Sequence, residues 1–248
     1  MKKIMSLVVV LLLNILILAD VKAAEISVAT AAIKYPVMYV NEKNEIVGCE
    51  PELATAVLKK LGYDKINFVD IGFDGLIPSL TSGKVDIIAS GLSITEARKK
   101  MVDYSDPYVE VGSKIYIRNS EKKVKSISDL KDKKLGTTIG TVQSDYAEKM
   151  EKEYGYKLVV FTTTDDMFAD LAKEVGGIDA VIENEASAKA YIEKTKMKIK
   201  AVGKTLNPTQ WAFGFRKSGQ EEMIAKVNKA LAELKKAGVI KKIYKKCI

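Results

Sequence analysis

Apolar and polar positions in the first part of the chain predict strands that alternate with helices. Ile26 to Ala29 alternates as a half-buried strand does. Pro51 suits the first turn of an amphipathic helix that Gly62 ends. The pattern also predicts strands at 46–48, 66–69 and 85–88 and a short helix through 76–80. Such a β-α-β-α-β order implies a parallel sheet with covered faces.

The same order of elements returns after a strand at 112–117, and it predicts a second α/β unit. Strands are expected at 135–138, 158–160 and 178–182, and helices at 144–154, at 164–175 and up to about 194. Two such units in series imply two lobes with a cleft between them. The closing strand at 211–215 and its amphipathic helix lack enough partners to stand alone. We expect residues 25–112 plus 207–248 to form the first lobe and residues 113–206 the second.

The N-terminus has the pattern of a secretory signal peptide. Lys2 and Lys3 precede an apolar run at 4–19, and small residues follow at Ala23 and Ala24. The alternative is a retained membrane anchor, for which the run is shorter than the roughly 20 residues of a span. We expect residues 1–24 to be removed and the mature protein to be periplasmic.

Charge and cysteine content narrow the function classes. Removal of the signal peptide lowers the formal net charge from +8 to +6, because it takes away Lys2, Lys3, Lys22 and Asp20. The remaining lysines are scattered along the chain, so no nucleic-acid partner is expected. The chain has no histidine and only two cysteines, so neither a metal nor a cofactor is expected. An exported chain permits a disulfide between cysteines 49 and 247, but the sequence does not pair them.

The loop at 89–98 follows a buried strand, where ligands of open α/β sheets bind. Gly91 permits close backbone approach and Ser93 supplies a hydroxyl. Thr95 suits a helix N-cap, which places Arg98 one turn in, able to bind a carboxylate with two donors. The alternative is a capped helix with a solvated arginine.

Two further turns between a strand and a helix are candidate sites. Gly140 to Gln143 offers free N–H groups to an anion, or is simply a turn. Glu183 to Glu185 offers acceptors for an ammonium group, or is an acidic helix start that the dipole favours.

Four motifs in fixed order, at 73–80, 82–86, 93–100 and 103–108, closely resemble the polar amino-acid-binding proteins of ABC importers. The resemblance covers essentially the mature chain. It implies the type II periplasmic-binding-protein fold, with two hinge strands near 110–114 and 204–210. It also implies a monomeric receptor that captures a small, amino-acid-like ligand and delivers it to the importer's membrane subunits.

The resemblance also implies which residues bind the ligand. Arg98 would bind the ligand α-carboxylate, helped by Ser93 and the backbone of Ser90 and Gly91. Phe73 would stack on the ligand side chain. The residues expected to close over the ligand from the second lobe are Thr138, Thr141, Val142 and Gln143.

Three positions depart from the family pattern. Ala31 replaces the Asp or Asn of members that bind basic amino acids. Where members carry a second aromatic, an ungapped register gives Lys34, with Tyr35 one place on, and we expect Tyr35 to face the ligand. The family's ammonium-binding Asp falls on Asn184, beside Glu183. Either Glu183 substitutes for it, or the ligand is not an ordinary α-amino acid.

The sequence thus favours a receptor that is not an enzyme. Some relatives of this fold are cyclohexadienyl dehydratases, in which a cleft carboxylic acid protonates a leaving hydroxyl. Glu183 could serve that role, so this enzyme is the alternative. An extracellular sensor or adhesion protein is a third option that the sequence leaves open.

Overall fold

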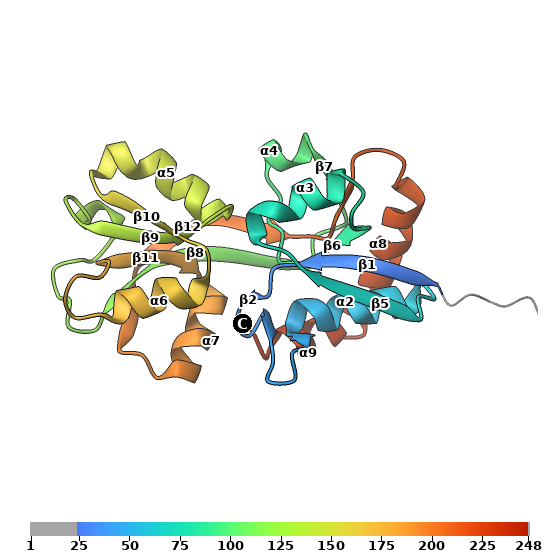
Figure 1. Ribbon diagram of the computed structural model, residues 1–248, viewed down its shortest axis with the longest axis horizontal. Coiled ribbons are helices and arrows are strands. Elements are labelled where there is room, and N and C mark those ends of the chain that lie inside the picture. The colour runs from blue at the N-terminus through green and yellow to red at the C-terminus, as the bar shows by residue number, and fades with distance from the viewer. Residues whose placement is uncertain (1–23, 248) are drawn as a thin grey trace, which may run out of the picture.

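Two α/β lobes lie end to end along the long axis of the molecule (Figure 1). The computed structural model describes residues 24–247, so the predicted signal peptide, apart from Ala24, lies outside the described residues. Each lobe is built on a five-stranded sheet with helices on its faces. None of the helices between residues 24 and 247 has the length and apolarity that crossing a membrane requires.

The sheet of the first lobe has the order β5-β1-β6-β13-β7. These strands are Lys65–Asp70 (β5), Glu25–Thr30 (β1), Ile87–Ile88 (β6), Gly214–Arg216 (β13) and Val102–Tyr104 (β7). β1 pairs in parallel with β5 and β6, as the sequence predicts, and β13 runs antiparallel to β6 and β7. Because β1 and β6 are parallel, the loops that follow them meet at one edge of the sheet.

Alternate side chains of β1 enter two different cores. Ile26 and Val28 pack in one core with the helices Cys49–Lys60 (α2), Glu221–Lys236 (α8) and Val239–Tyr244 (α9). Ala29 packs in another core with Leu76–Thr81 (α3) on the opposite face. This is the two-residue period that the sequence shows. A small antiparallel sheet of Ile33–Lys34 (β2), Met38–Val40 (β3) and Ile46–Val47 (β4) lies between β1 and α2.

The sheet of the second lobe has the order β10-β9-β11-β8-β12. Its strands are Lys157–Phe161 (β10), Lys134–Thr138 (β9), Ala180–Asn184 (β11), Val109–Arg118 (β8) and Ile199–Trp211 (β12). The first three are parallel to one another, and β8 is antiparallel to β11 and β12. The helices of this lobe are Val142–Tyr154 (α5), Thr164–Ala172 (α6) and Glu185–Thr195 (α7). β11 again divides its side chains, with Ile182 in one core and Val181 in the other.

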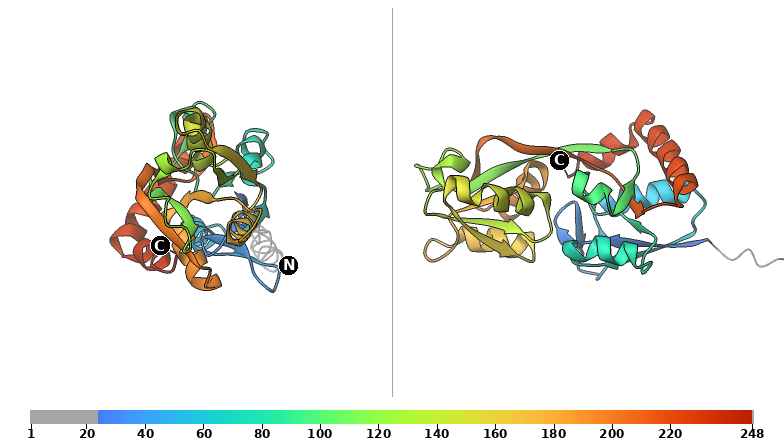
Figure 2. Two further views of the ribbon diagram at one scale, coloured as in Figure 1. Left: turned by 90° about the vertical axis from the view of Figure 1, so that its left-hand side faces the viewer. Right: turned by 90° about the horizontal axis from the view of Figure 1, so that it is seen from above.

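The long strands β8 and β12 connect the lobes. They pair from Val109 opposite Trp211 to Arg118 opposite Ile199, and the ladder is interrupted by two register shifts. Seen from above, both strands run from one lobe to the other (Figure 2). Trp211 also forms a backbone bridge with Ser93 of the first lobe. Bending at this pair of strands would therefore change the separation of the lobes.

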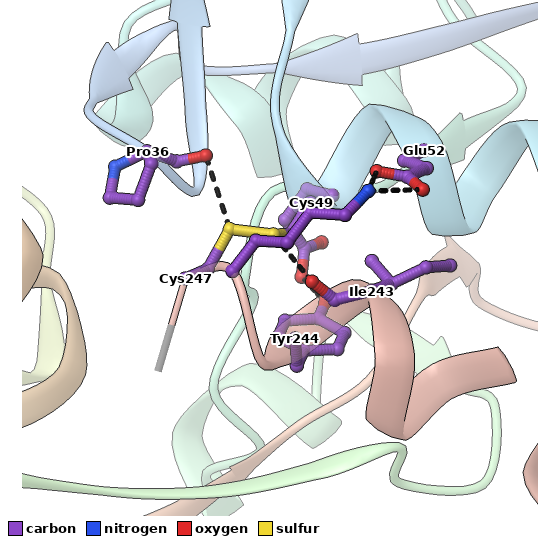
Figure 3. Close-up of a disulfide and its surroundings, with 8 residues drawn as sticks. Pro36, Cys49, Glu52, Ile243, Tyr244 and Cys247 are labelled. Carbon is purple, nitrogen blue, oxygen red and sulfur yellow. Dashed lines mark hydrogen bonds and ion pairs between the residues drawn. A yellow bond between two sulfur atoms is a disulfide. The ribbon is translucent and has the colours of Figure 1, made fainter. Parts of the chain in front are cut away.

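The two cysteines form a disulfide, which settles the pairing that the sequence leaves open. Cys49 begins α2 and Cys247 follows α9, and their Cα atoms are 6.5 Å apart. Figure 3 shows this bond and, near it, Glu52 of α2, whose carboxylate lies 2.9 Å from Lys246 Nζ. The end of the chain is thus held against the start of α2 by a covalent bond and an exposed ion pair.

Candidate ligand-binding site

The loop after β6 is held to the loop after β1. Ser90 Oγ accepts a hydrogen bond from the N–H of Ala31 at 2.9 Å. Thr95 caps the short helix α4 (Glu96–Lys99), as the sequence predicts, because its Oγ1 accepts from the N–H of Arg98 at 3.1 Å. These contacts place Arg98 at the edge of the first sheet, next to the second lobe.

Arg98 is a buried cation that spans the two lobes. Its guanidinium donates to the carbonyl oxygen of Ser93 at 3.0 Å and, across the cleft, to that of Gly140 at 2.9 Å. It also lies 5.7 Å from the centre of the Phe73 ring. Burial lowers the pKa of Arg98, against the opposing effects of Tyr104 and Asp145. Among residues 24–247, no carboxylate forms an ion pair with it, so the guanidinium can accept an anion from outside the protein.

In the second lobe, the turn between β9 and α5 faces this arginine. Thr141 caps α5 by accepting from the N–H of Ser144 at 3.2 Å, and its hydroxyl donates to the carbonyl of Thr138 at 2.7 Å. Val142 and Gln143 form the buried first turn of α5. Gln143 donates to Ser113 Oγ of β8 at 2.9 Å, which fixes the start of the helix against the strand that connects the lobes.

A second polar contact crosses the cleft between β2 and β11. Lys34 Nζ lies 3.0 Å from Glu183 Oε1, and the two side chains are only 7% and 2% exposed. The same oxygen of Glu183 accepts a hydrogen bond from the N–H of Asn184 at 2.7 Å. A buried carboxylate and a buried ammonium therefore neutralise each other between the lobes.

Asn184 caps α7 with its side-chain oxygen, and its side-chain nitrogen has no hydrogen-bond partner among the described residues. Its Oδ1 accepts from the N–H groups of Ala186 and Ser187, each at 3.1 Å. Its Nδ2 is buried and makes no hydrogen bond within the described residues. Since buried donors are nearly always paired, this nitrogen is a candidate to bind an acceptor atom of a ligand.

The lobes are nearly closed on each other, and the cavity left in the cleft between them is only about 10 Å³. The first lobe lines it with Lys34, Met38, Phe73, Ser90, Gly91, Ser93 and Trp211, and the second lobe with Thr141, Val142 and Gln143. Gly91 has a φ of +57°, and a Cβ on it would lie 3.1 Å from the Trp211 ring. Only glycine fits there without displacing the tryptophan.

Comparison with known proteins decides the family. Residues 26–248 match the model of the bacterial extracellular solute-binding proteins, family 3. The protein belongs to this family. The match extends over both lobes and includes every residue of the cavity.

Relatives of this solute-binding protein include binding proteins for amino acids. The arginine-binding extracellular protein ArtP of Bacillus subtilis (strain 168) is 33% identical over 216 residues, which are 83% of this chain and 79% of that protein. A solved ancestral arginine-binding protein bound to arginine is 38% identical, with a TM-score of 0.84, over 91% of this chain and 98% of the other. An ancestral amino acid-binding protein, described as a precursor of cyclohexadienyl dehydratase, is 32% identical with a TM-score of 0.81, over 90% and 95% of the two chains. The type II two-lobed fold expected from the resemblance is confirmed.

The structure of the solute-binding protein places one expected site residue away from the cavity. Lys34 lines the cavity and Tyr35 does not. β2 ends at Lys34, and Tyr35 begins the turn that leads to β3. Its ring instead packs on Tyr39 at 4.8 Å, with Lys194 Nζ of α7 at 3.6 Å from its centre.

The other expected residues of the solute-binding protein fall into two groups. Seven line the cavity, namely Phe73, Ser90, Gly91, Ser93, Thr141, Val142 and Gln143. Arg98 lies beside it through its bonds to the carbonyls of Ser93 and Gly140, Thr138 lies beneath the turn of Thr141, and Glu183 contacts Lys34. Asn184, which follows Glu183, lines a separate pocket with Val111 and Glu185.

Sequence reasoning missed Met38 and Trp211 as cavity residues of the solute-binding protein. Met38 lies in a three-residue strand that has no clear pattern of its own. Trp211 carries a usable signal, because it is the only tryptophan of the chain and comes at the return into the first lobe. Large aromatic side chains at lobe boundaries commonly line ligand sites.

Proposed function

We propose that this solute-binding protein captures an amino acid, or a similarly small carboxylate, between its lobes and presents it to an ABC importer. The observation that carries the proposal is Arg98, a buried guanidinium at the cavity edge that makes no ion pair within residues 24–247. A ligand carboxylate would receive the charge-assisted hydrogen bonds that Arg98 now makes with carbonyl groups. The names of the relatives support an amino acid as the ligand.

Contacts between the lobes support a capture mechanism. Arg98 and Lys34 of the first lobe both bond to groups of the second lobe, at Gly140 and Glu183. A ligand shifts such a molecule toward closure only if it binds the closed form more tightly. A carboxylate held by Arg98 beside the turn of Thr141 would contact both lobes at once, and it would supply that difference.

Export and assembly belong to the same proposal. We take residues 1–24 as a cleaved signal peptide, residues 25–112 plus 207–248 as the first lobe and 113–206 as the second. The mature chain would then act in the periplasm as a monomer that meets the importer. The two connecting strands, β8 and β12, support the two expected crossings between lobes.

Calorimetry of the mature chain tests the role of Arg98. We expect one or a few amino acids to raise the melting temperature of refolded, ligand-stripped protein, since binding stabilises the folded state by mass action. Arg98→Ala should weaken binding by about 2–5 kcal/mol, because a buried charge loses its partner. Lys99→Ala, which removes the exposed neighbouring cation, is the matched control and should leave affinity unchanged.

Two outcomes would contradict the proposal. Equal affinity in the wild type and in Arg98→Ala would remove the arginine from the site. No thermal shift with any amino acid, derivative or small carboxylate would reject capture altogether.

A further variant covers the case in which Arg98→Ala melts at a much lower temperature than the wild type. Arg98→Lys keeps the charge, so it separates a binding defect from a folding defect.

A dehydratase remains the second candidate function, favoured by the solved ancestral precursor and by the buried Glu183. A general acid must be able to give up a proton to its substrate. Glu183 is instead contacted by the Lys34 ammonium at 3.0 Å, which suits a carboxylate. Turnover of prephenate or arogenate by the purified protein would establish the enzyme, and recovery of these compounds unchanged would reject it.

A further inference from the structure

The Lys34–Glu183 ion pair changes the charge that the cleft offers to a ligand. Lys34 comes from the first lobe and lines the cavity, while Glu183 comes from the second lobe. Breaking a buried ion pair is costly, because the partner left behind keeps an uncompensated charge. Glu183 is therefore occupied by a cation of the protein itself, and it is a poor countercharge for a cationic ligand side chain.

The Lys34 ammonium has N–H donors that Glu183 does not use. An ammonium group carries three N–H donors. Within residues 24–247, Glu183 is its one ion-pair or hydrogen-bond partner. Because the lysine side chain borders the cavity, the remaining donors are available to a ligand acceptor. A carboxylate is the acceptor that binds an ammonium most strongly.

The ionised groups at the cleft leave a surplus of positive charge. Arg98 and Lys34 are cations, and in the part of the chain that the structure describes Glu183 is the single anion within ion-pair distance of either. Asn184 adds no charge. Asp145 acts on Arg98 only at a distance, because it favours the charged guanidinium without forming an ion pair with it. Glu50, which is fully buried, has a pKa raised by burial, and this favours its neutral form. A ligand with one carboxylate and one ammonium would leave this surplus in place, whereas a second carboxylate would neutralise it.

We propose that the ligand carries two carboxylates, one bound by Arg98 and the other by Lys34, which makes Lys34 the residue that determines specificity. The inference rests on the proposed function of capture. The shared chemistry is the second carboxylate, which both an acidic amino acid and a dicarboxylate without an amino group possess.

Basic amino acids should be rejected for the same reason. The side-chain cation of arginine or lysine would lie near the Lys34 ammonium, in a cleft where water screens charge poorly. This separates the protein from the arginine-binding proteins it resembles. Ala31, where a carboxylate or amide would favour a basic ligand, lends no countercharge to offset the repulsion.

Titration calorimetry with a matched panel tests the second carboxylate. The probes are glutamate and aspartate, 2-oxoglutarate and succinate as diacids without an amino group, glutamine as the neutral isostere of glutamate, and arginine. We expect at least one diacid to bind about tenfold or more tighter than glutamine, and arginine to bind weakest. Tight binding of glutamate but not of 2-oxoglutarate identifies an acidic amino acid, and the reverse identifies a dicarboxylate.

Substitution of Lys34 tests which residue carries the preference. Lys34→Gln should reduce diacid affinity by about tenfold or more while glutamine affinity changes much less. Lys43→Gln removes an exposed lysine from the adjacent β3–β4 turn and is the matched control, expected to change neither. If loss of Lys34 alone destabilises the fold by leaving Glu183 unpaired, the double variant Lys34→Gln with Glu183→Gln removes both charges and should show the same loss of diacid preference.

The outcomes distinguish the two proposals. If arginine or glutamine binds better than every diacid and Arg98→Ala abolishes that binding, the second carboxylate is rejected and capture stands. If Lys34→Gln weakens all ligands equally, Lys34 does not determine specificity and the inference is overturned. If nothing in the panel or among the amino acids binds, both proposals fail.

Discussion

Glu50 is a buried carboxyl group in the first turn of α2, and it connects the site to the end of the chain. It accepts hydrogen bonds from the hydroxyl of Tyr108 at 2.8 Å, from that of Tyr244, and from the N–H of Gly91. Burial outweighs these bonds and raises the pKa of Glu50 above its ordinary value of 4.5. The backbone of the ligand loop is thus linked to α9 through one titratable group.

The raised pKa of Glu50 predicts how stability depends on pH. The folded protein binds the Glu50 proton more tightly than the unfolded chain, so this contribution to stability is lost as pH rises from about 4.5 through the raised folded value. The side chain of Glu50→Gln cannot ionise. As pH rises across this range, the melting temperature of the variant minus that of the wild type should therefore increase. Thermal unfolding at a series of pH values measures the difference.

The control for Glu50 lies two residues away. Glu52→Gln removes a carboxylate from the exposed side of the same helical turn, where it pairs with Lys246. A gain with rising pH in Glu52→Gln equal to that in Glu50→Gln would show that burial is not the cause.

At the residue scale, the sequence predicts the parts of the site that follow strands. Ser90 to Arg98 and the turn at Thr141 can be located because ligand loops lie at the carboxyl ends of parallel strands. The partner of Lys34 could not be predicted, since Glu183 lies on another lobe and far along the chain. A contact of that kind depends on how the lobes meet, which no local pattern records.

At the scale of elements, most helices and strands are found where the apolar pattern places them, and β12 is the clearest exception. The apolar pattern alone indicates no strand at 199–210, because lysines, Asn207 and Pro208 interrupt it, and only the family resemblance implies a hinge strand near 204–210. The segment nevertheless pairs with β8 as the edge of the second sheet, where charged residues and proline are tolerated. The helix predicted to reach Val175 ends at Ala172, because Lys173 takes an extended conformation with ψ 132°.

The element most dependent on the disulfide is α9. A helix of six residues is too short to be stable alone, so it relies on its packing in the first core and on the nearby bond of Cys247 to Cys49. Reduction should destabilise the protein by about 2–4 kcal/mol, mainly by freeing the unfolded chain. Denaturant unfolding with and without reductant measures this.

The double variant Cys49→Ser with Cys247→Ser provides the reference for reduction. It should unfold at the same denaturant concentration with and without reductant, close to the reduced wild type. A wild type that is insensitive to reductant, despite confirmed loss of the disulfide, would show that packing alone holds α9.

At the scale of the whole molecule, closure brings two turns into contact across the cleft. Gly140 of the second lobe has a φ of +71°, and a Cβ on it would lie 2.9 Å from Asp74 Cα and 3.0 Å from Asp74 N of the first lobe. A side chain here would force the lobes apart where Arg98 bonds to the Gly140 carbonyl.

The residue boundaries of the two lobes, at 112 and 207, stay a prediction.

Gly140→Ala should therefore weaken ligand binding by about 1–3 kcal/mol, the usual cost of overpacking a tight contact. Gly83→Ala is the matched control, because Gly83 has a φ of +76° but no atom within 4 Å of the added Cβ. Both variants share the backbone strain and should lose similar thermal stability without ligand, whereas only Gly140→Ala should lose affinity in calorimetry. Equal affinity in the two variants would mean that the Gly140–Asp74 contact is not part of the bound form.

Trp211 gives the molecule its own optical probe. It is the only tryptophan of the chain, it is 3% exposed, and it borders the cavity against Gly91 at the end of a strand that joins the lobes. Indole fluorescence excited at the red edge of protein absorption therefore comes from one position, at the meeting point of ligand, loop and hinge. Stopped-flow mixing of unlabelled protein with candidate solutes can follow that emission directly, which gives access to the rates of capture and release as well as to affinity.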